Sequence, residues 1–186
     1  RGAGLGDLAQ GVPLVVELAD ENGGLSQSAF RKRLQLGDLL RLHGDPEISR
    51  YLSASGAPWT EEMCAARLAL WMDEFATHRM GKLRVTRKAD GVLVGRAGFG
   101  LHPPTGEPEI GFALYRDQRG QGYATEAAAG LRDWLFAETE WDHFIGFADV
   151  RNAPSLAVLR AIGMRETEVQ DFHGMTCQFH VLEKAA

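Results

Sequence analysis

The chain has few cysteines, no long apolar run and no excess of positive charge. Its two cysteines, Cys64 and Cys177, lie far apart in 186 residues, so neither a disulfide framework nor a metal knuckle is expected. No apolar run approaches the ~20 residues of a membrane-spanning helix, so we expect no membrane partner. The net charge of −5 argues against nucleic-acid binding, because phosphate contacts need clustered lysines and arginines. A cytoplasmic protein is the default expectation.

The six histidines also lack the spacing of a metal site. Neither His-Glu-x-x-His nor Cys-x-x-Cys occurs, so we expect no metal. Hydrophobic residues make up 45% of the chain, which is long enough to bury a core. We therefore predict one folded domain over residues 12–186, preceded by a flexible glycine-rich tail over residues 1–11.

The stretch over residues 109–115 alternates apolar residues with small or polar ones, which predicts a strand. Glu109 is its only carboxylate and lies opposite the apolar face, either as an exposed charge or as the partner of an arginine. Gly111 and Ala113 share the face of Glu109 and would leave room there for a ligand. The apolar face consists of Ile110, Phe112 and Leu114.

A glycine-bearing loop follows that strand and leads into a helix with apolar residues at helical spacing. Gly120 and Gly122 allow positive φ or close approach of a ligand. They precede a first helical turn with unpartnered N–H groups, and Arg116 and Arg119 add positive charge, so the loop is predicted to bind an anion. A dinucleotide fold is disfavoured because Thr125 stands where its third glycine is needed.

The remaining elements are predicted from periodicity, caps and breakers. We expect strands over residues 12–18, 82–88, 92–100, 143–150, 164–172 and 175–182. We expect helices over residues 26–43 and 46–52, a long helix capped by Thr60, and a helix from Asn152 to Gly163. The buried side of the long helix is predicted to be Met63, Leu68, Trp71, Met72 and Phe75, and Cys64 on the same helix is expected to be a packing residue.

The segment Arg119-x-x-Gly122-x-Ala124 resembles the coenzyme A loop of the GNAT superfamily of N-acetyltransferases. The predicted order of elements over residues 29–183 is also similar to that family. Residues 45–71 resemble the two-helix segment of its ribosomal-protein N-terminal acetyltransferase (RimJ/RimL-like) branch. The resemblance implies an α/β acyl-CoA N-acyltransferase fold, with a mixed, mostly antiparallel sheet of six or seven strands flanked by helices.

The resemblance also implies a cofactor site. Acetyl-CoA would be the cosubstrate, with its pyrophosphate on the loop amides and its pantetheine arm along the strand. The implied cofactor-binding residues are Leu114, Arg119, Gly120, Gln121, Gly122, Tyr123, Ala124, Asn152 and Ser155. Asn152 and Ser155 also fit an ordinary helix cap, and the two readings are compatible. The family often has a tyrosine acid where this chain has Leu159.

The implied reaction is direct transfer of the acetyl group to a primary amine in a ternary complex. Glu109 is the implied base and Ser155 lies near the thioester; Glu107, Glu166 and Glu168 are weaker base candidates, and His102 is a candidate to face the acceptor. The acceptor stays open among a protein N-terminus, an amino acid and a small-molecule amine, and a homodimer is possible. The alternatives are a catalytically weak acyl-CoA-binding domain and a nucleotide-binding oxidoreductase or regulatory domain.

Overall fold

The computed structural model describes residues 14–15, 34–87 and 89–185, so the predicted tail lies outside the described residues. Seven strands form one sheet in the order β1-β2-β3-β4-β5-β7-β6. All neighbouring strands are antiparallel except β4 and β5, which are parallel. The mixed, mostly antiparallel sheet is therefore confirmed. The strands are β1 (Leu14–Val15), β2 (Lys82–Arg87), β3 (Leu93–Leu101), β4 (Pro108–Leu114), β5 (His143–Asp149), β6 (Arg165–Phe172) and β7 (Met175–Glu183).

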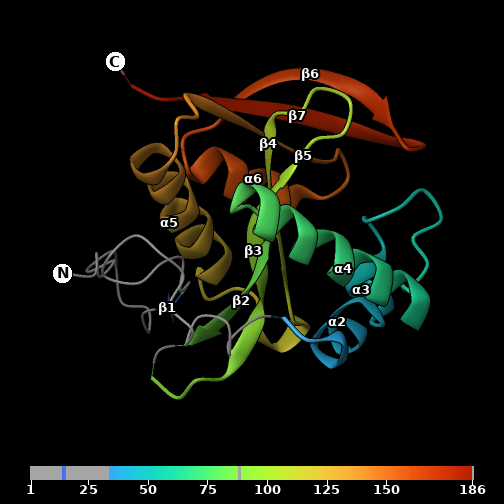
Figure 1. Cartoon of the computed structure of the whole chain (residues 1–186). Coiled ribbons are helices and arrows are strands. Elements are labelled where there is room, and N and C mark those ends of the chain that lie inside the picture. Colours follow the sequence, from blue (N-terminus) through green and yellow to red (C-terminus); the bar gives the residue numbers. More distant parts are fainter. Residues whose placement is uncertain (1–13, 16–33, 88, 186) are drawn as a thin grey trace.

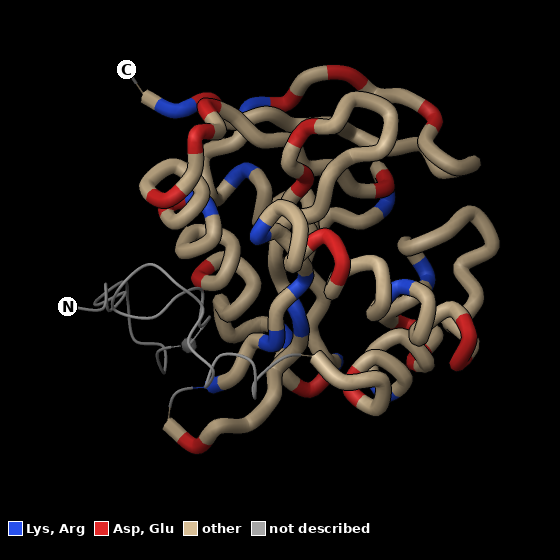
Figure 2. The backbone as a smooth tube through the Cα atoms, in the orientation of Figure 1, with Lys and Arg blue, Asp and Glu red and all other residues tan. Residues whose placement is uncertain are grey.

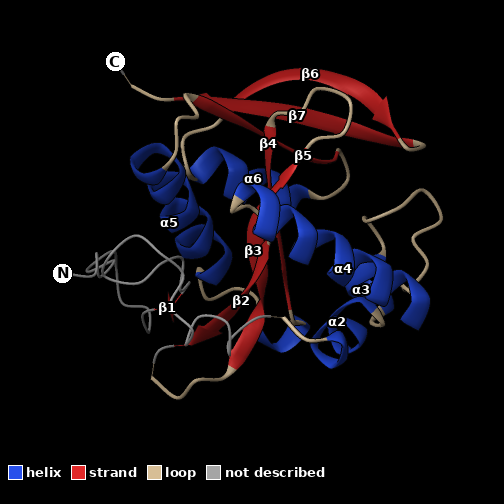
Figure 3. Cartoon of the chain, in the orientation of Figure 1, coloured by secondary structure: helices blue, strands red, loops and turns tan. Residues whose placement is uncertain are grey.

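Helices flank the sheet on both faces (Figures 1 and 3). The described helices are α2 (Leu36–His43), α3 (Pro46–Ser49), α4 (Glu61–His78), α5 (Tyr123–Glu138) and α6 (Ala153–Ala161), with a 3-10 turn η1 (Arg116–Gln118). One face of the sheet packs against α5 and α6 and forms the main core, with Phe99, Ile110 and Phe144 at most 2% exposed. The face that carries Glu109 is turned toward α2, α3 and α4.

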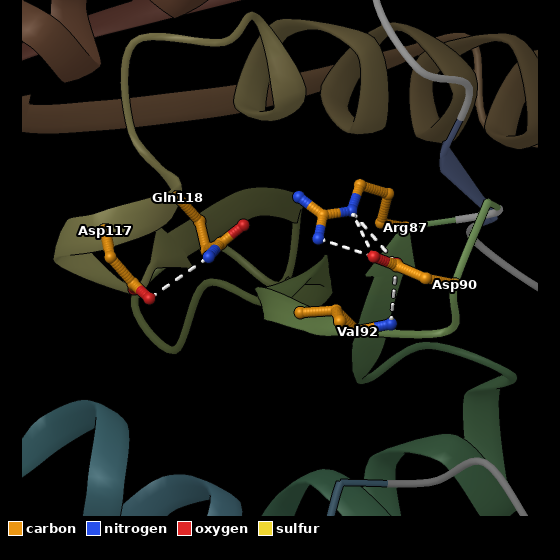
Figure 4. A network of polar contacts seen from close by, with 5 residues as sticks. All are labelled: Arg87, Asp90, Val92, Asp117 and Gln118. Atoms are coloured by element: carbon orange, nitrogen blue, oxygen red, sulfur yellow. Dashed lines mark hydrogen bonds and ion pairs between the residues drawn. The ribbon is translucent and has the colours of Figure 1, made fainter.

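The β2–β3 hairpin forms at the predicted turn. Arg87 N donates to Val92 O and Gly91 N donates to Arg87 O, both at 2.8 Å. The Asp90 carboxylate accepts from the Arg87 guanidinium, with Nε to Oδ1 at 2.9 Å, and from Val92 N at 3.1 Å (Figure 4). In the same view, Gln118 Nε2 donates to the Asp117 carboxylate in η1. The side chain of Asp90 thus stabilises the turn that sets the register of the two strands.

The long helix begins where predicted but buries a narrower stripe. Thr60 Oγ1 accepts from Met63 N at 3.3 Å, as an N-cap does. Met63 and Met72 are 46% and 45% exposed, so their predicted burial is wrong. Helix α4 packs against α2 along one stripe of its surface, and that stripe consists of Cys64, Leu68 and Trp71. Residues one position outside that stripe turn toward solvent.

The first described helix starts later than predicted. Gln35 is the N-cap of α2 and has extended φ and ψ of −111° and 159°. The predicted helix over residues 26–43 is therefore wrong at residues 34–35, and residues 26–33 lie outside the described residues. Leu39 and Leu42 of α2 are buried as predicted.

Candidate functional site

Strands β4 and β5 pair at one point only in the part of the chain that the structure describes. Their parallel ladder holds the single pair Glu109–Ile145, whereas the β3–β4 ladder continues to Leu114 and the β5–β7 ladder to Asp149. Beyond that pair, the facing backbone edges of β4 and β5 have no ladder partner. Such unpaired edges can bond to an extended ligand that lies between the strands.

The helix that follows β4 begins with a run of free N–H donors. Gly120 and Gly122 have φ of 76° and 80°, and a Cβ on either would meet no heavy atom within 4 Å. The first bond of α5 runs from Glu126 N to Gly122 O at 3.0 Å. Among the described residues, the backbone N–H groups of residues 120–125 have no acceptor. An open loop with unpartnered donors at a helix N-terminus suits a phosphate group.

The side chains of this loop differ in their exposure and in their contacts. Arg119 Nε donates to the Leu114 carbonyl at 3.3 Å, so Arg119 joins the loop to the end of β4. Gln121 is exposed, and Ala124 is half-buried. Tyr123 is 2% exposed and packs in the main core, so only its backbone N–H can reach a ligand. The structure thus places the predicted residues of the loop together, chiefly through their main chain.

The helix that follows β5 presents a second, smaller set of polar groups. Asn152 Oδ1 accepts from Ser155 N at 3.4 Å, which confirms Asn152 as the cap of α6. The Ser155 hydroxyl makes no hydrogen bond with a described residue, and the side chain is half-buried. Leu159, where the related family often has a tyrosine, is 1% exposed in the core. It offers no acid group at that position.

Glu109 forms an ion pair with a lysine that sequence reasoning missed. Lys82 Nζ lies 3.4 Å from Glu109 Oε2 and donates to the carbonyls of Gly98 at 3.0 Å and Glu109 at 3.2 Å. The side chains of Lys82 and Glu109 are 6% and 23% exposed. Neither predicted alternative for Glu109 is therefore right, because it is half-buried and its partner is a lysine. The space over Gly111 is also filled, since a Cβ there would lie 2.8 Å from Lys82 Nζ.

A third charged group, Glu74 of α4, completes what we call the Lys82 cluster (Lys82, Glu74 and Glu109). A Cβ on Gly100 would lie 3.4 Å from Glu74 Oε2 and 3.7 Å from Lys82 Nζ. Burial lowers the pKa of Lys82, and the charge of Glu109 opposes that shift. Burial raises the pKa of Glu74, and the charge of Lys82 opposes that shift. Buried groups whose pKa values are perturbed by burial and by specific charge partners gather at functional sites, so this cluster is a candidate part of one.

His102 lies within electrostatic range of the same cluster. It is 5% exposed, and its ring lies 5.0 Å from the ring of Phe172 and 5.7 Å from that of Phe147. Burial lowers the pKa of His102, while the charges of Glu109 and Glu107 act in the opposite direction. The imidazole is therefore neutral at neutral pH and able to accept a proton.

The other predicted carboxylates are occupied elsewhere. Glu107 lies 3.1 Å from His143 Nε2, and Glu166 accepts from Arg160 Nε at 2.7 Å. Glu168 is exposed on β6. Glu109 and Ser155 share no contact in the part of the chain that the structure describes. Any reaction that uses both therefore needs a substrate between them.

The described residues hold neither a membrane-spanning helix nor a metal-binding group. None of the described helices is long and apolar enough to cross a membrane. The described His, Cys, Asp and Glu side chains form no group that would hold a metal ion.

Comparison with known families and proteins agrees with this geometry. The family model described as an acetyltransferase (GNAT) domain matches residues 29–165. The chain is 23% identical over 140 residues to the N-acetyltransferase p20 of Bacillus licheniformis, which covers 73% of this chain and 78% of that protein.

Three solved structures have the same fold. An acetyltransferase from Agrobacterium tumefaciens superposes with a TM-score of 0.69 and 22% identity, over 82% of this chain and 89% of that chain. Spermidine N-acetyltransferase from Vibrio cholerae, solved with CoA and spermine, has a TM-score of 0.64 and 15% identity, over 82% of this chain and 93% of that chain. The ribosomal L7/L12 α-N-protein acetyltransferase RimL, solved with CoA, has a TM-score of 0.63 and 13% identity, over 82% of this chain and 92% of that chain. The predicted α/β fold is confirmed.

Proposed function

The chain belongs to the acetyltransferase (GNAT) domain family, and we propose that it transfers an acetyl group from acetyl-CoA to a primary amine. The observation that carries this proposal is the run of N–H groups over residues 120–125 without an acceptor among the described residues, in the loop that Arg119 joins to the end of β4. Similar proteins have been solved with CoA bound.

The chain's own residues fit such a cosubstrate. Backbone N–H groups of the loop from Gly120 to Ala124 would hold the pyrophosphate, with the exposed end of Arg119 adding charge and Gln121 at the surface. The edge of β4 up to Leu114 would pair with the pantetheine arm, and Asn152 and Ser155 would face that arm from α6. Acetyl-CoA would supply the activated thioester.

The proposed reaction is direct attack without a covalent enzyme intermediate. The amine nitrogen forms a bond to the acetyl carbon while the carbon–sulfur bond breaks. Glu109 takes the amine proton, directly or through a water, and Ser155 or a water that it holds returns a proton to the thiolate. A backbone N–H of β4 polarises the thioester carbonyl, and alignment of amine and thioester supplies most of the rate.

The acceptor is proposed to be an α-amine or another amine of low pKa. An α-amine has a pKa of ~7.7–8.0 and a lysine side chain ~10.4, so the free base of an α-amine costs roughly 1 kcal/mol at pH 7 and that of a lysine about 4–5 kcal/mol. One half-buried carboxylate in an ion pair suits the easier deprotonation. A RimJ/RimL-like protein N-terminus, an amino acid and a small amine all fall within this class, and a homodimer is compatible with it.

Ligand thermal shift tests the cofactor assignment. We expect acetyl-CoA and CoA to raise the melting temperature and NAD(H) to leave it unchanged. Stabilisation by NAD(H) alone would instead favour a nucleotide-binding domain. Release of free thiol from acetyl-CoA over a panel of amines then separates an enzyme from a domain that only binds acyl-CoA.

A further inference from the structure

Arg96 of β3 is a buried cation that has no carboxylate partner among the described residues. It is 5% exposed and lies opposite Ala113 in the β3–β4 register, on the same face as Glu109. Its Nε donates to His43 Nε2 at 2.9 Å, and its guanidinium carbon lies 4.9 Å from the centre of the Trp71 ring. Buried arginines are normally paired, because an uncompensated charge in the interior is costly.

The terminal nitrogens of Arg96 are free to bind a ligand. They make no hydrogen bond with a described residue, and neither is among the enclosed side-chain atoms that lack a partner, so each keeps a small exposed area. The neighbouring arginines differ in this respect. Arg84, directly opposite Arg96 on β2, has the Asp38 carboxylate at 3.6 Å, and Arg87 pairs with Asp90.

The groups that hold Arg96 in place leave its charge intact. Burial, followed by the charge of Arg96, lowers the pKa of His43 to about 2, so the imidazole is neutral and Nε2 accepts the bond. The His43 ring stacks on Trp59 with centroids 4.0 Å apart. A neutral ring and an indole face therefore fix the direction of the guanidinium without neutralising it.

The charges around Arg96 leave a positive excess. Burial lowers the pKa of Arg96 to about 10, and the Glu109 charge opposes the shift while Arg67 adds to it. Glu109, the carboxylate whose charge acts on Arg96, is already paired with Lys82. Lys and Arg segments lie along the strands at the centre of the molecule in Figure 2. An anion that entered beside Arg96 would be attracted by both cations.

We propose that Arg96 binds an oxyanion of the amine acceptor, a carboxylate or a phosphate, while the amino group of the same molecule reaches Glu109. This inference rests on the function proposed above and adds the acceptor class to it. The planar guanidinium presents two terminal nitrogens to an oxyanion, which is the geometry of a bidentate pair. A polyamine would place an ammonium group against Arg96 and Lys82 and is disfavoured by repulsion.

The spacing of the two groups is set by the sheet. Arg96 lies opposite Ala113 and Gly100 lies opposite Glu109, so four residues separate the two positions along each strand. That distance is roughly 13 Å between backbone positions, part of which the two side chains span. Probe acceptors should therefore cover a range of lengths between amine and acid.

The test uses the whole chain and a panel of ω-amino carboxylates, from glycine to 6-aminohexanoate, each matched with its carboxamide. Phosphoethanolamine is the acceptor probe with a phosphate group, and spermidine is the acceptor probe with only cationic groups. Acetyl transfer is followed by thiol release. We expect the best acid to exceed its amide in kcat/KM by about tenfold or more, since a charge-assisted hydrogen bond is lost in the amide. The oxyanion is identified by whether a carboxylate probe or phosphoethanolamine gives the higher kcat/KM.

Arg96→Met is expected to raise the KM of the acid probe about tenfold or more. The KM of the matched amide and the KM of acetyl-CoA should stay unchanged. Arg84→Met is the matched control, because it removes the same charge from the facing position on β2 and should keep the preference for acids. Arg96→Lys keeps the charge but loses the planar fork, so an intermediate preference is expected. If Arg96→Met does not fold, the acid–amide comparison on the unchanged chain decides.

The outcomes separate this inference from the proposed function. Transfer to amides or spermidine as efficient as transfer to acids overturns the acceptor class and leaves acetyl transfer standing. Binding of acetyl-CoA with transfer to no anionic probe overturns the acceptor class as well. A chain that acetyl-CoA does not stabilise overturns the proposed function itself.

Discussion

The ion pair between Lys82 and Glu109 determines how the carboxylate can act. The ammonium group lies at 3.4 Å and bonds to two backbone carbonyls, so it holds Glu109 at one end of the unpaired edge of β4. Its burial lowers its own pKa. The ion pair therefore fixes the position from which Glu109 can take a proton.

Glu109→Gln is expected to lower kcat by about ten- to a hundredfold near neutral pH, because an amine of low pKa needs less help than the ~10²–10⁴-fold that a general base typically contributes. A rise in pH should recover part of the loss, since more of the acceptor amine is then deprotonated. Glu107→Gln is the matched control, because Glu107 is paired with His143 outside the cluster. The measurement is the pH–rate profile of thiol release. An unchanged profile in Glu109→Gln would move the role to another group, and His102→Gln then tests the neutral imidazole.

At the scale of single residues, the sequence pattern indicated the polar face but not its burial. Lys82 and Arg84 alternate with apolar residues along β2, which is also the pattern of a solvent-facing edge. The structure covers that face with α4, so Lys82 and Arg96 are buried. Whether a helix covers a polar face depends on contacts between distant segments, which local periodicity does not contain. The strand position of Glu109 and the positive φ of Gly120 and Gly122 could be predicted because their pattern is local.

At the scale of elements, the loop before α5 can be tested by a glycine substitution. Gly122→Val is expected to raise the KM for acetyl-CoA at least tenfold, because a branched side chain at the helix start would occupy the space of the phosphate. Gly91→Val is the matched control. Gly91 has a φ of 71° and Gly122 a φ of 80°, and a Cβ on either residue would meet no atom within 4 Å. The backbone strain of the two substitutions is therefore comparable. Steady-state kinetics with varied acetyl-CoA measures the difference.

An unchanged KM in a folded Gly122→Val protein would contradict the assignment of the loop. Arg119→Ala is expected to have a smaller effect that shrinks at high salt, because its exposed charge is screened. Part of that effect would come from the lost bond to the Leu114 carbonyl rather than from the ligand.

The order of elements could be predicted well from the sequence. Alternation defined β4, the Asp90 turn defined the β2–β3 hairpin, and Thr60 and Asn152 defined two helix starts. The break in the β4–β5 ladder could not be predicted, because it depends on how two strands separated by a helix meet. The narrow buried stripe of α4 has the same kind of cause, since its width depends on how α4 meets α2 and strand β3, which are distant in the sequence.

At the scale of the whole molecule, three buried histidines make stability dependent on pH. Burial is the largest cause that lowers the pKa of His43, His102 and His180. These rings take up protons at a lower pH in the folded protein than in the unfolded chain, whose histidines take them up below about pH 6.5. The unfolded state then binds more protons, so stability is fully present above pH 6.5 and falls as the pH decreases below it.

His143 acts in the opposite direction. The hydrogen bond that His143 Nδ1 donates to the Asp142 carboxylate, at 2.6 Å, is the largest cause that raises its pKa, and Glu107 contributes as well. Its contribution is present below pH 6.5 and is lost as the pH rises through the raised value. Glu74, whose pKa burial raises, acts in the same direction as His143. Three buried histidines against these two groups predict a net loss of stability on the acid side.

We expect the free energy of unfolding to fall between pH 6.5 and pH 5, with each buried histidine contributing up to about 1.4 kcal/mol per pH unit. Urea unfolding at several pH values measures this slope. His43→Gln should flatten it, because the amide oxygen can still accept from Arg96 Nε and does not titrate, while His143→Gln should steepen it by removing the opposing contribution. Equal slopes in the unchanged chain and His43→Gln would mean that His43 takes up its proton alike in both states, contrary to its enclosed position between Arg96 and Trp59.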